Sequence, residues 1–170
     1  MLSILRDTEY CVKLKNQSVA LRDPKSSMVF REPYTNLIRR HLGRHPKRAD
    51  GVTAAALRKY ERRLGLRLPA AMREYYLIAG RVDELNREHN VLFRLDELRI
   101  EESHLWFMEE NQAVVHWGLP TKRLAEDDPS VYQRANVGRA KWYSERMRFS
   151  EFLIDTFDWQ AGCGDAAHEG

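Results

Sequence analysis

The sequence predicts a single α+β domain in which helices pack around a small sheet, mainly antiparallel or mixed, with a hairpin at its centre. The main observation is the run His104–Pro120, where two short segments are rich in aromatic and β-branched residues. The segments on both sides of this run instead carry apolar residues at helical spacing. The length of 170 residues is typical of one domain.

The two apolar segments, Leu105–Met108 and Ala113–Trp117, are expected to pair as the central hairpin. The polar residues 109–112 between them form its turn. Gly118 and Pro120 are expected to end the second strand. Large apolar side chains alternate onto both faces of each segment, so the hairpin is expected to be covered on both sides.

Helices are expected before and after this hairpin. Each has a start signal, which is either a proline in the first turn or a Thr or Ser cap, and three of them stop at glycine. They are expected to run from Pro33 to Leu42, from the Thr53 cap to Leu64, from Pro69 to Ala79 and from the Ser150 cap through Glu151 to Trp159. Two further short strands are expected at residues 131–134 and 141–143.

The folded domain is expected to span residues 33–160. Residues 1–32 form an N-terminal extension, either a hairpin across Lys15–Ser18 or a loose arm. Residues 161–170 are expected to form a flexible tail, because this segment has no apolar face to bury.

Three features of the sequence indicate where in the cell the protein is expected. No apolar run approaches the roughly 20 residues of a membrane span. The hydrophobic start Met1–Leu5 is too short for a signal peptide. Cys11 and Cys163 have no metal-ligand spacing and are expected to be reduced thiols. These observations favour the cytoplasm.

The net charge of +3 conceals an asymmetry along the chain. Residues 1–68 contain 16 Lys or Arg against 6 Asp or Glu, a balance of +10, whereas residues 69–170 contain 12 against 19, a balance of −7. A basic segment can meet nucleic acid, and an acidic segment can meet a basic protein. Ordinary solvation of the surface also accounts for both segments.

The residues point to no catalytic site, metal or cofactor. The neighbouring acids Glu109-Glu110 and Asp127-Asp128 would point to opposite faces of a strand, whereas acid/base pairs must face each other across a substrate. His104 and His116 could lie opposite each other across the hairpin and share a metal with Glu109 or Glu110, but a full zinc ligand set is not evident. Partly buried, hydrogen-bonded histidines are the favoured interpretation. No phosphate-binding or dinucleotide fingerprint is present.

Three blocks of the sequence carry a resemblance to a known family. They are LRKYERRLGLRLPAAMREYYLIAG, then LWFMEENQAVVHWGLP, and then DPSVYQ followed by FSEFLIDTFDWQ. In content, order and spacing they resemble the SUKH superfamily, over roughly residues 34–160. The chain departs from the family pattern at Ala79-Gly80, where the family often has Asn-Gly, and in its N-terminal extension.

The resemblance implies an α+β domain without catalytic activity. Many SUKH proteins are similar in being immunity proteins of bacterial toxin systems, which bind a cognate toxin, often a nuclease. The expected partner is therefore a protein toxin with a basic nuclease domain, and the expected action is stoichiometric neutralisation. Other members have regulatory or scaffold roles, so a regulatory or scaffold interaction module of the same fold is the alternative.

The candidate partner-binding residues come from the acidic second half of the chain and from its tryptophans, because acids can complement a basic toxin and tryptophan anchors many interfaces. They are Glu84, Glu88, Glu101, Glu102, Trp106, Glu109, Glu110, Asn111, Trp117, Glu126, Asp127, Asp128 and Trp142. Core packing is the favoured alternative for the tryptophans. For residues 109–112, a structural turn held by Asn and Gln side chains is an equal alternative.

A second alternative function, from another class, is nucleic-acid binding through a basic segment of the first half of the chain. Its candidate residues are Arg39, Arg40, Arg44, Lys47 and Arg48. This segment lacks interleaved aromatic residues and a zinc signature, so it is less favoured than protein binding.

Overall fold

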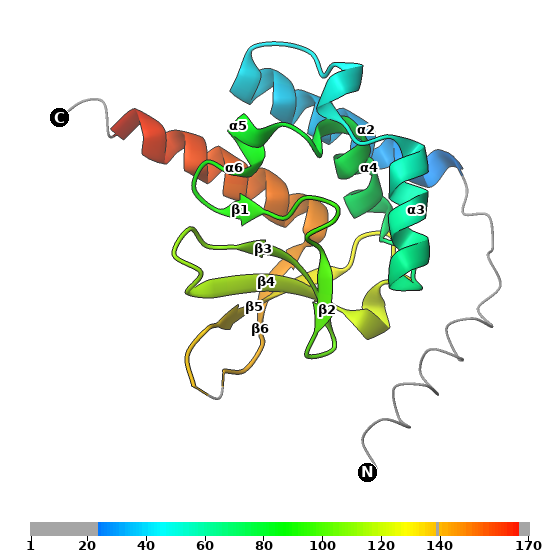
Figure 1. The fold of residues 1–170 in the computed structure, drawn as a ribbon. Helices are drawn as coiled ribbons and strands as arrows, with labels where there is room; N and C mark the ends of the chain where they lie inside the picture. Colours follow the sequence, from blue (N-terminus) through cyan, green and yellow to red (C-terminus); the bar gives the residue numbers. More distant parts are fainter. Residues whose placement is uncertain (1–23, 139, 167–170) are drawn as a thin grey trace.

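The computed structural model describes residues 24–138 and 140–166, and within them the chain folds as the expected α+β domain (Figure 1). The hairpin considered across Lys15–Ser18 lies outside the described residues. Among the residues described, no helix is both long and apolar enough to cross a bilayer.

A single antiparallel sheet of six strands, counted over the described residues, forms the centre of the domain. Its strand order is β1-β3-β4-β5-β6, and β2 pairs with β3 beside β1. The strands are β1 (Val91–Leu92), β2 (Arg99–Glu101), β3 (His104–Glu109), β4 (Val115–Pro120), β5 (Ser130–Ala135) and β6 (Tyr143–Arg148).

The expected central hairpin is confirmed as β3 and β4, with Leu105 paired to Leu119 and Trp106 paired to Gly118. The prediction that Gly118 breaks the second strand is wrong, because β4 continues through this residue and ends at Pro120. Gly118 pairs on its two sides with β3 and β5, and Pro120 stands at the last position of the strand, where a missing N–H is tolerated.

The last strand also differs from the expectation. It spans Tyr143–Arg148 instead of residues 141–143. Trp142 stays outside the strand because its ring lies flat against His104 of β3, with the ring centroids 3.9 Å apart. A contact between residues so far apart in sequence cannot be read from the local pattern.

The long helices lie together on one side of the sheet (Figure 1). They are α2 (Pro24–Leu42), α3 (Ala54–Leu64), α4 (Ala70–Ala79) and α6 (Phe149–Ala166), with shorter turns η1 (Arg48–Asp50), α5 (Asp83–Asn86) and η2 (Thr121–Arg123) between them. The expected cap of α3 is confirmed, since the Thr53 hydroxyl accepts a bond from the Ala56 N–H at 3.1 Å. Gly65 closes α3 with a φ of 68°.

Two helix boundaries lie further out than the sequence indicated. Helix α2 begins at Pro24, so Pro33 is inside the helix instead of at its start, and residues 24–32 belong to the first helix of the domain. A proline inside a helix removes a backbone hydrogen bond, and here the Arg31–Glu74 ion pair of 2.8 Å and buried Tyr34 tie this part of α2 to α4. Helix α6 continues to Ala166, so residues 161–166 of the expected tail are helical.

The main core lies between the helices and the sheet. The stripe of Met72, Tyr75 and Tyr76 on α4 is fully buried, as expected for core. Burial raises the pKa of Tyr75 and Tyr76 far above their usual range, so both stay neutral. Their hydroxyls donate to the Asn86 side chain and to the Phe93 carbonyl, each at 2.6 Å. The loops that follow α4 are therefore held to the core.

Candidate protein-binding face

The two faces of the sheet have different coverings. Phe107 packs on Phe149 and Phe152 of α6, with centroid distances of 5.1 and 5.9 Å, and Trp117 packs on Phe152 at 5.7 Å. Alternate residues of a strand point to opposite faces, so Trp106 and Gly118 point away from the helices. The hairpin is therefore covered on both faces, as expected, but helices cover one face only: on the second face, Trp106 is buried by neighbouring side chains of the sheet and by Trp142 from the segment before β6.

This second face is here called the open face. It consists of side chains from three strands and from the segment before β6. Its members are His104, Trp106, His116, Tyr132, Arg134 and Trp142.

A chain of aromatic rings runs across the open face. Trp142 stacks on His104 with an interplanar angle of 11°, and its edge meets Trp106 at a centroid distance of 5.7 Å. Trp106 in turn lies 4.5 Å from the ring of His116. Trp106 is only 4% exposed, whereas Trp142 is half-buried and reaches solvent. The outer member of the chain is thus available to a partner.

Gly118 makes room for this arrangement. A Cβ atom at residue 118 would stand 2.9 Å from the Trp142 ring and 3.1 Å from the Cβ atom of His104, both shorter than ordinary contacts. The Trp142 ring therefore lies directly on the backbone of β4. This contact gives a structural reason for the Trp117-Gly118 pair: Trp117 faces the helices, and Gly118 lies beneath a tryptophan on the other face.

Charged groups surround the rings. The Arg134 guanidinium lies 5.8 Å from the centroid of Trp106 and the Arg99 guanidinium 5.0 Å from it, both within the range of cation–π contacts. Glu102 pairs with Arg134 at 2.9 Å and accepts a bond from the Trp142 indole N–H at 3.3 Å. These contacts hold Trp142 and Arg134 in fixed positions.

The two histidines of the open face do not lie opposite each other. His104 pairs with Pro120 and His116 with Glu109, at the two ends of the hairpin, so the arrangement considered for a shared metal is wrong. Among the residues described, no group of three or more His, Cys, Asp or Glu side chains is placed to hold a metal ion.

Burial lowers the pKa of both histidines. For His116, which is 5% exposed, burial outweighs the nearby Glu109 carboxylate, which lies 3.4 Å from Nε2 and raises the pKa, while Arg99 and Arg134 lower it further. For His104, burial likewise outweighs the bond to the Glu102 carbonyl at 2.9 Å. The Nδ1 atom of His116 is buried and has no hydrogen-bond partner among the residues that the structure describes. Both imidazoles are therefore neutral at neutral pH.

The open face brings together some of the predicted binding residues but not all. Trp106, Trp142 and Glu102 lie in it, and Glu101 and Glu109 lie at its edges, paired with Arg99 and His116. Trp117 lies on the opposite face, where its indole N–H donates to Glu145 at 2.7 Å. Glu84 lies in α5 and Glu88 in the connection that follows it; both are exposed, and neither belongs to the open face.

Residues 110–114 form the turn of the hairpin, which is held by a carboxylate, whereas Glu109 is the last residue of β3. Glu110 accepts bonds from the backbone N–H groups of Gln112 at 3.0 Å and Val114 at 3.4 Å, and Ala113 has a φ of 55°. The turn was expected to be held by Asn and Gln side chains, but Glu110 does this, while Asn111 is exposed. The structural interpretation accounts for Glu110 without a binding role.

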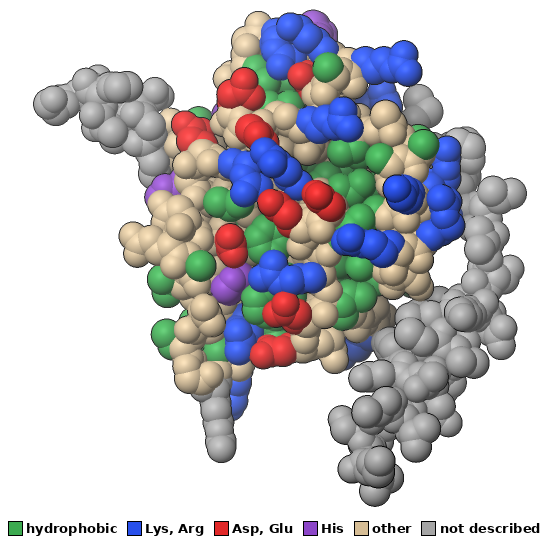
Figure 2. Space-filling view, in the orientation of Figure 1, with side chains coloured by type: hydrophobic (Ala, Val, Ile, Leu, Met, Phe, Trp, Pro, Cys, Tyr) green, Lys and Arg blue, Asp and Glu red, His purple; other side chains and the backbone are tan. Residues whose placement is uncertain are grey.

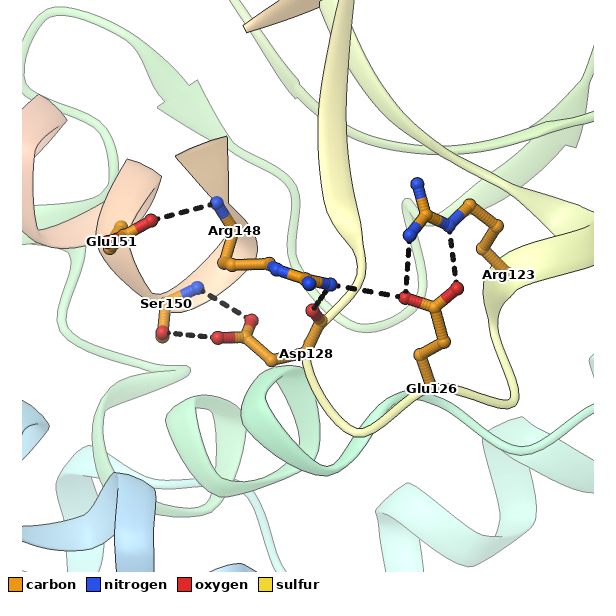
Figure 3. Close-up of polar contacts among 6 residues, drawn as sticks. All are labelled: Arg123, Glu126, Asp128, Arg148, Ser150 and Glu151. Carbon is orange, nitrogen blue, oxygen red and sulfur yellow. Dashed lines mark hydrogen bonds and ion pairs between the residues drawn. The ribbon is translucent and has the colours of Figure 1, made fainter. Parts of the chain in front are cut away.

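Glu126 and Asp128 lie in a network that fixes the start of α6 (Figure 3). Asp128 accepts from the Ser150 N–H at 3.0 Å and from its hydroxyl at 2.6 Å, so Asp128, and not Ser150, caps the helix, which begins at Phe149. Burial raises the pKa of Asp128, although both bonds from Ser150 lower it. Glu126 pairs with Arg123 at 2.6 Å and with Arg148 at 3.3 Å.

The Asp127 backbone carbonyl belongs to the same connection, since it accepts a bond from the Ala71 N–H at the start of α4 at 2.9 Å. The 126–128 segment therefore joins two helices to β5. These contacts account for Glu126 and Asp128 in terms of the fold.

The basic segment considered for nucleic acid is partly neutralised. Arg40 makes two bonds to Asp158 of α6, at 3.0 and 2.9 Å, and Arg44 makes two bonds to Asp50, at 2.6 and 3.1 Å. The remaining candidates, Arg39, Lys47 and Arg48, are exposed. A surface hollow of about 610 Å³ lies beside Arg39, Arg40 and Arg44.

Four members of the open face were missing from the predicted binding residues: His104, His116, Tyr132 and Arg134. The alternation of Tyr132 and Arg134 along a strand is visible in the sequence and places them on one face. Their position beside Trp106 depends on the register of β4 with β5, which the sequence does not reveal. Comparison of the chain with protein-family models and with curated proteins finds no match.

Proposed function

We propose that this chain is a non-catalytic, cytoplasmic SUKH-type domain that neutralises a cognate bacterial toxin, most simply a nuclease, by stoichiometric binding. The three ordered sequence blocks that resemble the SUKH superfamily support the choice of partner. The open face supports the choice of surface, and it is the observation that carries the proposal.

The chemistry of the open face fits a protein interface. Tryptophan, tyrosine and arginine are enriched among the residues that dominate binding energies, particularly where they are held in place and partly desolvated. Trp142 meets both conditions, because it is half-buried, stacked on His104 and bonded to Glu102. A rigid aromatic side chain also loses little conformational freedom when a partner covers it.

The charges on this face favour a mixed interface over simple mimicry of nucleic acid. Glu101 and Glu102 are exposed, but each is paired with an arginine of the chain itself. A basic partner would therefore meet aromatic rings bordered by ion pairs instead of a run of bare carboxylates. Such borders guide the approach and orientation of a partner more than they add to affinity.

The test starts with the full-length tagged chain and lysate of its own source grown in mixed culture. We expect one partner with a basic C-terminal domain to bind at a 1:1 ratio in sedimentation velocity experiments. Trp142→Ala should weaken that complex by about 2 kcal/mol or more in calorimetric titration, as truncation of a central interface residue does. Protection of cells that express the partner should be lost in parallel.

Trp159→Ala is the matched control, because Trp159 is an exposed tryptophan on α6, remote from the open face. Equal losses for both variants would contradict the choice of surface. Recovery of regulatory or cell-wall synthesis proteins, without a toxin, would favour the scaffold function instead. Steeply salt-dependent DNA or RNA binding, lost when Arg39, Lys47 and Arg48 are replaced, would favour the nucleic-acid function.

A further inference from the structure

A second surface, separate from the open face, has the form of a groove. It has a volume of about 860 Å³ and lies between α3 and the segments 80–83 and 94–96. It is here called the α3 groove. None of its lining residues belongs to the open face. They are Val52, Ala56, Lys59, Tyr60, Arg62, Arg63, Gly80, Arg81, Asp83, Arg94, Leu95 and Asp96.

The floor of the α3 groove is apolar. Tyr60 and Leu95 are buried beneath it, and Val52 and Ala56 are half-buried at its side. Figure 2 shows hydrophobic side chains at the surface here, between the blue side chains of Lys and Arg. Because its atoms form no hydrogen bonds with water, an apolar floor favours contact with aliphatic or aromatic side chains of a partner.

The rim of the groove is strongly basic. Five Lys and Arg side chains line it, against two Asp side chains. One of the acids, Asp83, is already paired with Arg94 at 2.6 Å. Within the described part of the chain, Lys59, Arg62 and Arg81 form no ion pair, and all three are exposed. The groove therefore has free positive charge above its apolar floor.

The walls of the groove are held by backbone bonds. The Val52 N–H donates to the Tyr76 carbonyl at 2.9 Å and the Arg81 N–H to the Asp50 carbonyl at 2.8 Å. Across the groove, Arg63 donates to the Asp96 carbonyl at 3.2 Å and lies 4.5 Å from the ring centroid of Tyr60. A groove with such fixed walls does not have to be ordered when a ligand binds.

We infer that the α3 groove binds an acidic peptide segment of a protein partner, with apolar side chains on the floor and Asp or Glu side chains against Lys59, Arg62 and Arg81. The charge of the rim selects an acidic occupant, and the floor selects a peptide with apolar anchors over nucleic acid. Residues 1–23 of the chain carry four Lys or Arg against three Asp or Glu and so lack the negative charge expected of this occupant. A basic toxin would not fit the groove either, so its occupant is a second partner.

The test uses phage that display random 12-residue peptides, selected on the full-length chain. Selected peptides are expected to combine Asp or Glu with Leu, Ile, Phe or Trp. A fluorescein-labelled copy of the dominant peptide is then titrated by fluorescence anisotropy. The double variant Lys59→Glu/Arg62→Glu is expected to bind it at least about tenfold more weakly at low salt. The matched control is Arg58→Glu/Arg67→Glu, which changes the charge equally at exposed positions outside the groove and should retain the affinity.

A second variant, Ala56→Lys, separates the floor from the rim. The lysine side chain would fill the apolar floor while it adds positive charge, so affinity for the acidic peptide is expected to fall several-fold even though the electrostatic attraction rises. Unchanged or tighter binding by Ala56→Lys would overturn the apolar part of the inference. Selected peptides without acidic residues, or equal effects of the rim and control variants, would overturn its electrostatic part.

A labelled duplex oligonucleotide is titrated in parallel. Binding of the duplex that is lost in Lys59→Glu/Arg62→Glu and kept in Ala56→Lys would overturn the inference in favour of a phosphate-binding surface. Because Trp142 lies outside the groove, Trp142→Ala is expected to leave peptide affinity unchanged. Failure of the groove inference is thereby distinguishable from failure of the proposed function.

Discussion

The two faces of the sheet differ in the way they bury similar side chains. On the helix-covered face, Phe107 is fully buried against two phenylalanines of α6, and the fully buried Leu119 of β4 also points to the helices. On the open face, Trp106 is almost as deeply buried, but the groups that cover it are two arginines, the buried His116 and the half-buried Trp142. Phe107 is thus buried by other core residues, whereas Trp106 reaches a similar degree of burial mainly through polar side chains.

Within one strand, the residues that stabilise the fold and the residues that can bind a partner therefore lie on opposite faces of the sheet. A gap in the helix-covered core cannot be filled by water without cost, so loss of a side chain there leaves a cavity. A gap on the open face can be reached by solvent, so its residues can be changed at a smaller cost in stability. A partner can use such a face because its side chains are ordered without being essential to the fold.

The largest expected effect is on the helix-covered face. Phe107→Ala should lower the free energy of unfolding by about 3–5 kcal/mol, because it removes a fully buried ring between Phe149 and Phe152. Urea denaturation followed by circular dichroism measures this loss. If the midpoint shifted no more than in Trp142→Ala, the distinction between the two faces would not hold.

A medium effect is expected where the sheet meets α6. Asp128→Ala removes the acceptor of both bonds from Ser150 and should destabilise the domain by about 0.5–2 kcal/mol. Asp128→Asn keeps an oxygen acceptor and is the control, with a smaller expected loss. Thermal denaturation at neutral pH compares the two variants, and an equal loss in both would show that the charge matters more than the acceptor.

Asp128 also illustrates what the sequence can and cannot predict. The α+β class, the central hairpin, the Thr53 cap and the Gly65 stop follow from signals within a few residues, and all are confirmed. The start of α6 was assigned to the nearest capping residue, Ser150, because the true cap lies 22 residues earlier in the chain. Local patterns do not contain contacts at that separation.

The candidate site was likewise predictable only where the signal lies in the residue types, and not where it depends on contacts between distant parts of the chain. Trp106, Glu102 and Trp142 were selected for their residue types, and the fold brings them together. Residue type alone could not separate them from Trp117, which is on the helix-covered face because of strand alternation. Nor could it show that Glu101, Glu102 and Glu126, among the nine selected acids, pair with arginines, since those pairs depend on sheet register and on the path of loops.

A smaller loss of stability is expected on the open face. Trp142→Ala removes the stack on His104 and should cost about 1 kcal/mol, well below the loss in Phe107→Ala. Near-ultraviolet circular dichroism should lose the signal of the packed indole. Gly118→Ala should alter the same signal, because the new Cβ displaces the Trp142 ring without removing it. Trp159→Ala, at an exposed tryptophan, should leave folding almost unchanged.

The smallest effect is a pH dependence confined to the open face. Because burial lowers the pKa of His104 and His116 in the folded state, the unfolded chain takes up protons first as the pH falls below about 6.5. The stability contributed by the neutral imidazoles is full above that pH and is lost as the pH falls towards the folded pKa values. The free energy of unfolding cannot change by more than about 1.4 kcal/mol per pH unit for each histidine.

His116→Phe isolates the contribution of His116. It removes a titrating ring whose buried Nδ1 has no hydrogen-bond partner, so the variant should be as stable as the natural chain at pH 7.5 and more stable at pH 5.5. Asp128 does not interfere, because its raised pKa gives the opposite sign: it adds stability as the pH falls, and its ordinary value lies near 4. Urea denaturation at the two pH values measures the difference. If His116→Phe were instead less stable than the natural chain at pH 5.5, Glu109, and not burial, would set the charge of this histidine on the open face.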